Sequence, residues 1–157
     1  MPTEKKMRRK VDESVNVYGA GVIIKHLDAL EQELEGVREA KDIEYIHRMR
    51  VASRRLRSAL DIFWEHMPQK KRDHWMEQIR SITRALGQAR DLDVQIESIE
   101  KILGALPDQT YRPGIERLLL RHRQRRARLQ EAVAHSLDSL ISSGVLSDIR
   151  LKLRYLR

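Results

Sequence analysis

One stretch, residues 42–63, constrains the fold of this chain most strongly. It reads DIEYIHRMRVASRRLRSALDIF, contains neither glycine nor proline, and its pattern recurs with a period near four. That period predicts an α-helix of about five to six turns. One side of the helix is apolar and gathers Ile46, Met49, Ala52, Leu56, Ala59, Leu60 and Phe63. We therefore expect a long amphipathic helix that packs against a hydrophobic core.

The other side of this helix carries a stripe of bases. His47, Arg50, Arg54 and Arg57 fall at i, i+3, i+7 and i+10, so they align along one face. Neighbouring like charges on a helix repel by about a few tenths of a kcal/mol per pair. The planar fork of arginine matches the oxygens of phosphate or carboxylate two at a time. We interpret the stripe as an anion-binding site, with a solvated surface face as the alternative.

Composition limits the classes of protein and partner. The 157 residues, 41% of them hydrophobic, suit one domain with a real core. The formal net charge of +8 favours polyanionic partners. Cysteine is absent, which removes disulfides and thiolate metal sites and is compatible with a reducing cytoplasm. No secretory signal and no apolar run of about 18 residues is present, so we expect no membrane span.

Helical patterns fill the rest of the chain, and no strand pattern persists. Residues 1–12 are predicted to be a basic flexible arm, and residues 13–157 a single helical domain. Ser14 and Asp42 are the predicted N-caps of the first two helices. The expected fold is all-α, an antiparallel helical bundle.

Gly87 is predicted to end a third helix, and Arg90 to open a fourth. Asp91 and Asp93 would then lie in a first turn, where the helix dipole favours acids. Alternatively, these two acids orient the arginines of helix 42–63.

Three inward-facing residues are unusual for a core. His26 shares the apolar stripe of the first helix, where a hydrogen-bonded core histidine and a ligand contact are both open. His122 and Arg126 lie in the apolar stripe of a helix predicted over 115–142. A buried arginine is costly unless it meets an acid, a water-filled channel or an anionic ligand.

Catalysis and metal binding have no support in the sequence. Neither a nucleophile elbow nor a glycine-rich phosphate loop nor a Walker motif occurs. No two histidines have the spacing of a helical ligand pair, and we expect no cofactor. Nucleic acid and protein partners stay open, although aromatic residues that would stack bases make up only 4%.

Two motifs carry a family resemblance. Residues His47 to Leu60, HRMRVASRRLRSAL, with Phe63, strongly resemble the signature of the CHAD family, the conserved histidine α-helical domain. Residues Leu86 to Val94, LGQARDLDV, are similar to its second motif. The resemblance covers approximately residues 14–157 and implies the four-helix first half of a domain that has two such halves.

The resemblance implies a non-enzymatic module that binds inorganic polyphosphate in a basic channel, often on polyphosphate granules in the cytoplasm. It also implies a triphosphate-tunnel or other polyphosphate-metabolising protein as a partner. By position, the family's binding residues correspond to His47, Arg50, Arg54, Arg55, Arg57 and Arg90, with Asp91 beside them. Their positions in the apolar stripes add His26, His122 and Arg126 as candidate contacts to polyphosphate, and Asp93 is added as a supporting acid. Protonation of His47 is expected to strengthen binding in mildly acidic solution.

The C-terminus ends in apolar residues, Leu151, Leu153 and Leu156, that need a partner. A second copy of the chain would cover both this end and the one-sided basic face. A homodimer is therefore expected to replace the missing half.

Overall fold

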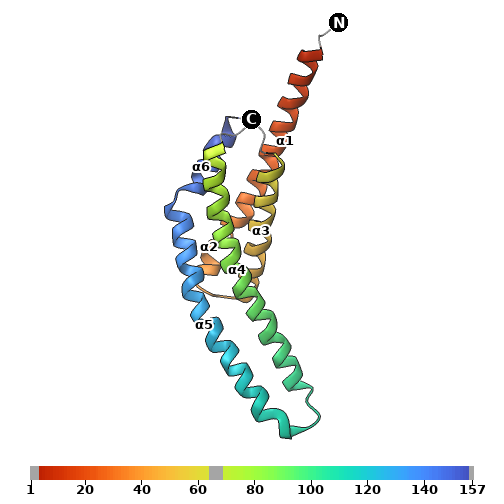
Figure 1. The fold of residues 1–157 in the computed structure, drawn as a ribbon, viewed down its shortest axis with the longest axis vertical. Helices are drawn as coiled ribbons and strands as arrows, with labels where there is room; N and C mark the ends of the chain where they lie inside the picture. The colour runs from red at the N-terminus through yellow and green to blue at the C-terminus, as the bar shows by residue number, and fades with distance from the viewer. Residues whose placement is uncertain (1–3, 64–68, 156–157) are drawn as a thin grey trace.

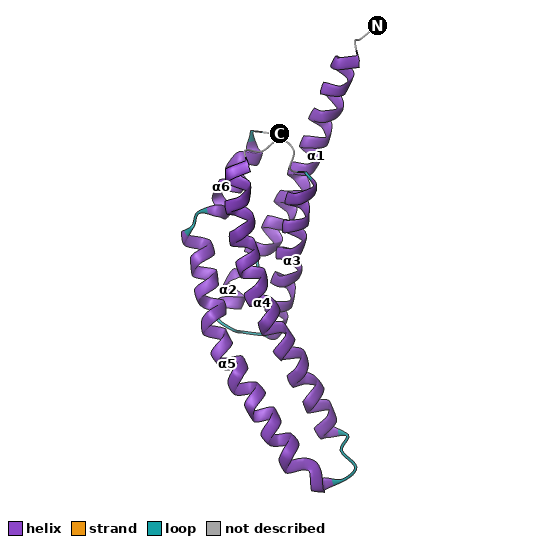
Figure 2. Cartoon of the chain, viewed as in Figure 1, coloured by secondary structure: helices purple, strands orange, loops and turns teal. Residues whose placement is uncertain are grey.

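The computed structural model describes residues 4–63 and 69–155, which form helices joined by short loops and contain no strand (Figure 2). The elements are α1 (Glu4–Glu31), α2 (Leu34–Arg38), α3 (Ile43–Ile62), α4 (Gln69–Gly104), the 3-10 helix η1 (Gln109–Tyr111), α5 (Arg112–Ser142) and α6 (Val145–Arg154). The long helices α1, α3, α4 and α5 alternate in direction (Figure 1). The predicted all-α bundle is confirmed.

One hydrophobic core joins the helices of the bundle, including the short α2 through Val37. Side chains with almost no solvent exposure come from α1, α3, α4, α5 and α6, and they include Leu27, Leu56, Ile79, Leu137 and Ile149. The apolar side predicted for α3 lies in this core, with Phe63 packed at its edge. α3 lies between α1 and α4, so the basic residues of α3 can face either of these two helices.

Local signals account for two helix starts. Asp42 is the N-cap of α3, as predicted, because its side chain accepts a hydrogen bond of 3.0 Å from the backbone N–H of Glu44. Gly144 separates α5 from α6 with a φ of 69°, in the left-handed region that favours glycine. The chain can therefore turn sharply and return α6 onto the core.

The prediction that Ser14 caps the first helix is wrong. α1 begins at Glu4, so Ser14 lies inside it. Residues 5–10, KKMRRK, are all good helix formers, which explains why the helix extends so far. This part of α1 leads away from the bundle (Figure 1). Residues 1–3 lie outside the described residues, and the flexibility of segment 1–12 stays a prediction.

The prediction of a helix stop at Gly87 is also wrong. α4 continues from Gln69 to Gly104 without a break. A glycine inside a helix costs about 1 kcal/mol relative to alanine, which packing of the flanking Leu86 and Ala89 in the core offsets. Asp91 and Asp93 therefore lie in mid-helix, and the dipole of a first turn does not apply to them.

α4 and α5 extend together beyond the rest of the bundle as a two-helix hairpin (Figure 1). Apolar side chains such as Leu92, Ile99 and Leu119 are buried in this pair, separately from the main core. Within the described ranges, no helix combines the length and hydropathy needed to cross a lipid bilayer.

Candidate functional site

The bases predicted to share one stripe of α3 lie on two sides of that helix. His47, Arg54 and Arg55 line hollows between α3 and α1. Arg50 instead crosses to α4, where its Nε lies 3.7 Å from the position of a Cβ built on Gly87. Because Gly87 belongs to the second motif, the two motifs meet at this crossing.

We call the two adjoining hollows between these helices the α1–α3 groove. Their volumes are about 430 and 270 Å³, and both are lined by His26, Val51 and Arg55. The basic side chains of the groove are His26 from α1 and His47, Arg48, Arg54 and Arg55 from α3. Its apolar lining includes Val22, Ala52, Ala59 and Phe63. A concave surface with convergent bases is suited to an anionic guest.

The positive charge of the groove is not neutralised from within. Glu33 is its only acid among the described lining residues, and Arg48 Nε donates a 3.1 Å hydrogen bond to that carboxylate. Arg54 and Arg55 are exposed, and no carboxylate in ranges 4–63 and 69–155 pairs with either. Two guanidiniums are thus available to bind oxygen atoms of a guest.

The two histidines of the groove come from opposite walls. Burial lowers the pKa of His26 below its ordinary value, and the charges of Arg55 and Lys25 lower it further. His47 Nδ1 is buried and has no hydrogen-bond partner within the described structure. Both rings line the smaller hollow, so the two histidines are placed to contact one bound anion.

A separate hollow, of about 590 Å³, lies along the start of α4. It is lined by Asp61 of α3 and by Arg72, Asp73, Met76, Glu77, Ser81 and two arginines that the sequence analysis missed, Arg80 and Arg84. Their spacing of four residues was a usable signal. Three acids in this hollow balance its three arginines, so it favours polyanions less than the α1–α3 groove does.

The remaining predicted arginines of α3 and α4 are less accessible. Arg57 is half-buried, and no described carboxylate pairs with it. The Arg90 side chain is 18% exposed, and its Nη1 lies 4.0 Å from Glu44 Oε1. That Nη1 atom is buried and makes no hydrogen bond within the described structure. Arg90 thus lies at the margin of α3, away from the α1–α3 groove.

Arg126 meets an acid, the first of the three outcomes expected for a buried arginine. Its Nε donates a 2.7 Å hydrogen bond to Asp93 Oδ1, and its Nη1 donates one of 3.1 Å to Gln130. Gln130 in turn donates to the carbonyl oxygen of Val37 at 2.9 Å. The chain of contacts ties α4, α5 and α2 together. Asp93 therefore holds an arginine of α5, not the arginines of α3.

The other two predicted residues lie apart from the groove. His122 Nδ1 bonds with the carbonyl oxygen of Leu118, one turn earlier on α5. α5 packs mainly on α4, α2 and α6. Asp91 is exposed on α4. The structure thus brings together His26, His47, Arg54 and Arg55, and it leaves His122 and Arg126 elsewhere.

The fold and the position of the motifs agree with the comparison to known families. The family model described as the CHAD domain matches residues 21–155, most of the chain. The chain belongs to the CHAD family. Searches of curated proteins and of solved structures found no match. In this CHAD domain, the matched residues include both walls of the α1–α3 groove and the crossing of Arg50 over α4.

Proposed function

We propose that this CHAD domain binds inorganic polyphosphate in the α1–α3 groove and catalyses no reaction on it. The observation that carries the proposal is the convergence of His26, His47, Arg54 and Arg55 on one concave surface. The acid in that surface already bonds to Arg48. CHAD domains are linked to polyphosphate binding in general, which supports the same ligand.

The mechanism is multivalent electrostatic binding. Arg54 and Arg55 donate charge-assisted hydrogen bonds to phosphoryl oxygens, and the histidines donate further bonds. A guest with repeated charges gains from each additional contact, so affinity should rise with polyphosphate length. Each contact releases counterions, so affinity should fall steeply as salt concentration rises. The groove has few aromatic residues, which favours phosphates without bases.

The same proposal includes the expected partners and place of action. A domain that holds polyphosphate would act beside a triphosphate-tunnel or other polyphosphate-metabolising protein, in the cytoplasm or on polyphosphate granules. A second copy of the chain is a further proposed partner. It would cover the exposed apolar side chains of Val15, Val17 and Tyr18 on α1 and of Ile62 on α3.

Calorimetric titration with long-chain polyphosphate tests the proposed site. We expect Arg54→Ala with Arg55→Ala to weaken binding at least about tenfold, since each lost charged hydrogen bond costs about 1–3 kcal/mol. The matched control is Arg121→Ala with Arg125→Ala, which removes the same charge from the exposed face of α5. Equal losses in the two variants would show binding through net charge alone and would refute the groove as the site.

Nucleic acid is a second candidate ligand, favoured by a different surface. Arg117, Arg121, Arg125 and Arg128 follow one exposed face of α5, and no described carboxylate pairs with them. An exposed helix with regularly spaced arginines can contact successive backbone phosphates. Titration with a double-stranded oligonucleotide at matched salt distinguishes the candidates. Nucleic acid binding through α5 would fail in the Arg121→Ala, Arg125→Ala variant and survive in the groove variant.

A further inference from the structure

His26 is surrounded by charged groups whose combined electrostatic effect on the ring would change when an anion binds. Across the α1–α3 groove it faces Arg54, Arg55 and His47 of α3, with Arg48 bonded to Glu33 beside them. Lys25 is its basic neighbour on α1. α6 also packs on α1, but its Arg150 bonds to Asp28 and Glu31 there. His26 thus lies among positive groups, and the one groove acid is already paired.

We propose that His26 binds a phosphoryl group of the guest as an imidazolium, so that ligand binding in the α1–α3 groove is coupled to the uptake of one proton. This inference rests on the proposed function and names a proton-dependent step in it. The geometry supports it because His26 and Arg55 line both hollows of the groove. A phosphoryl oxygen that Arg55 binds would therefore also face the His26 ring.

The free protein disfavours the charged form of this ring. Burial and the nearby charges of Arg55 and Lys25 lower the pKa of His26, which favours the neutral ring in the free protein. A phosphoryl anion reverses the local field and favours the imidazolium. The pKa of His26 is then higher in the complex than in the free protein. Between those two values, binding must take up a proton, and affinity must rise as pH falls.

The slope of affinity against pH has a defined limit. Uptake of one proton changes the binding constant by at most about tenfold for each pH unit inside this interval. Below the pKa of the free His26, the ring is charged before binding, and the pH dependence from this group ends. Above the pKa of His26 in the complex, polyphosphate binds the neutral ring, and its affinity does not change with pH through this group.

The test is calorimetric titration of the full chain with long-chain polyphosphate from pH 5.5 to pH 8, in pairs of buffers with different ionisation enthalpies. The internal phosphoryl groups of long chains keep one charge each through this range, so proton uptake reports on the protein. We expect the wild-type chain to take up about one proton in the interval and to bind more tightly as pH falls. His26→Asn should lose this proton uptake, and its affinity should change less with pH than that of the wild-type chain. His26→Gln provides a second variant if the first is poorly folded.

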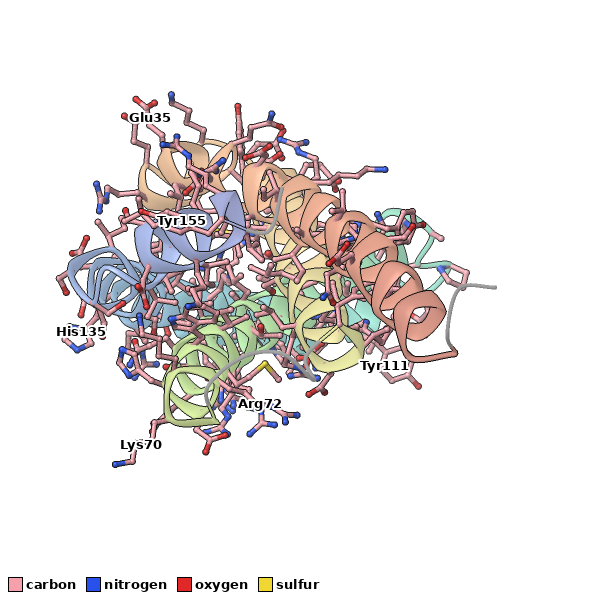
Figure 3. All side chains as sticks on the ribbon, turned by 90° about the horizontal axis from the view of Figure 1, so that it is seen from above. Glu35, Lys70, Arg72, Tyr111, His135 and Tyr155 are labelled. Atoms are coloured by element: carbon pink, nitrogen blue, oxygen red, sulfur yellow. The ribbon has the colours of Figure 1, made fainter. Side chains whose placement is uncertain are left out.

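The matched control is His135→Asn. His135 is exposed on α5, on the opposite side of the bundle from α1 (Figure 3), and its removal should leave proton uptake unchanged. Uptake that persists in both His26 variants but disappears in His47→Asn would assign the proton to His47 and overturn the inference, while the proposed function would stand. Absence of polyphosphate binding at every pH would overturn both.

Discussion

Some single residues are placed to bind a ligand, whereas others stabilise the helical bundle. Arg126 and Asp93 belong to the second group, since their side chains are 15% and 3% exposed and bond to each other. Burial raises the pKa of Asp93 above its ordinary value, although Arg126 and Arg90 favour its charged form. The sequence predicted an unusual buried arginine correctly. It could not show that the acid was on another helix, because facing residues of two helices are not adjacent in sequence.

Removing one member of this pair should destabilise the fold strongly. We expect Asp93→Ala to lower the free energy of unfolding by about 3–5 kcal/mol, because it leaves the Arg126 guanidinium buried without its acid. Urea unfolding measures this loss. Because the pKa of Asp93 is raised in the folded state, its contribution favours folding fully below about pH 4 and is lost as pH rises through the raised value.

The matched comparison replaces both partners, as Asp93→Leu with Arg126→Met. An apolar pair of similar volume should restore most of the stability. We expect this double variant to bind polyphosphate within about twofold of wild type, since Arg126 lies outside the groove. A large loss of affinity with a restored fold would show that Arg126 does contribute to polyphosphate binding.

At the scale of helices, periodicity predicted which faces are buried better than where helices end. The apolar side of α3 is buried as predicted, whereas Val15 of α1 is 49% exposed. Gly87 looked like a stop because the stabilising contacts on either side of it come from other helices. Of the three C-terminal apolar residues, Leu153 of α6 is fully buried in this chain's own core and needs no second chain to cover it. Leu151 is exposed, and Leu156 lies outside the described residues.

The spacing between α1 and α3 depends on a small residue at one end of the groove. A Cβ built on Gly19 would lie 2.5–2.8 Å from three atoms of Phe63, a residue that lines the groove. We expect Gly19→Ala to lower the free energy of unfolding by about 1–3 kcal/mol, because Phe63 must move within a packed contact. The measurement is thermal or urea unfolding.

Gly21 provides the control on the same helix. A Cβ there would meet no atom within 4 Å, so Gly21→Ala should stabilise the chain by up to about 1 kcal/mol through helix propensity. If both alanine variants were stabilised, the close contact between α1 and α3 at Gly19 would be wrong.

For the whole molecule, charge and motifs predicted a phosphate-binding helical domain, but not which helices form the site. The sequence assigns each residue to a face of its own helix, and packing alone decides which faces meet. His26 lies beside His47 because α1 packs on α3. His122 was grouped with them from its own stripe, yet α5 packs on α4 instead. The proposed site is therefore a groove between two helices, α1 and α3.

The most direct test of this groove is the NMR spectrum of the histidine side chains during titration with long-chain polyphosphate. The histidines act as separate reporters on different elements, with His26 and His47 in the groove and His122 and His135 on α5. We predict that the imidazole signals of His26 and His47 shift together with saturation, while those of His122 and His135 stay in place. Shifts confined to the α5 histidines, or no shift at any of the four under conditions where calorimetry detects binding, would contradict the account.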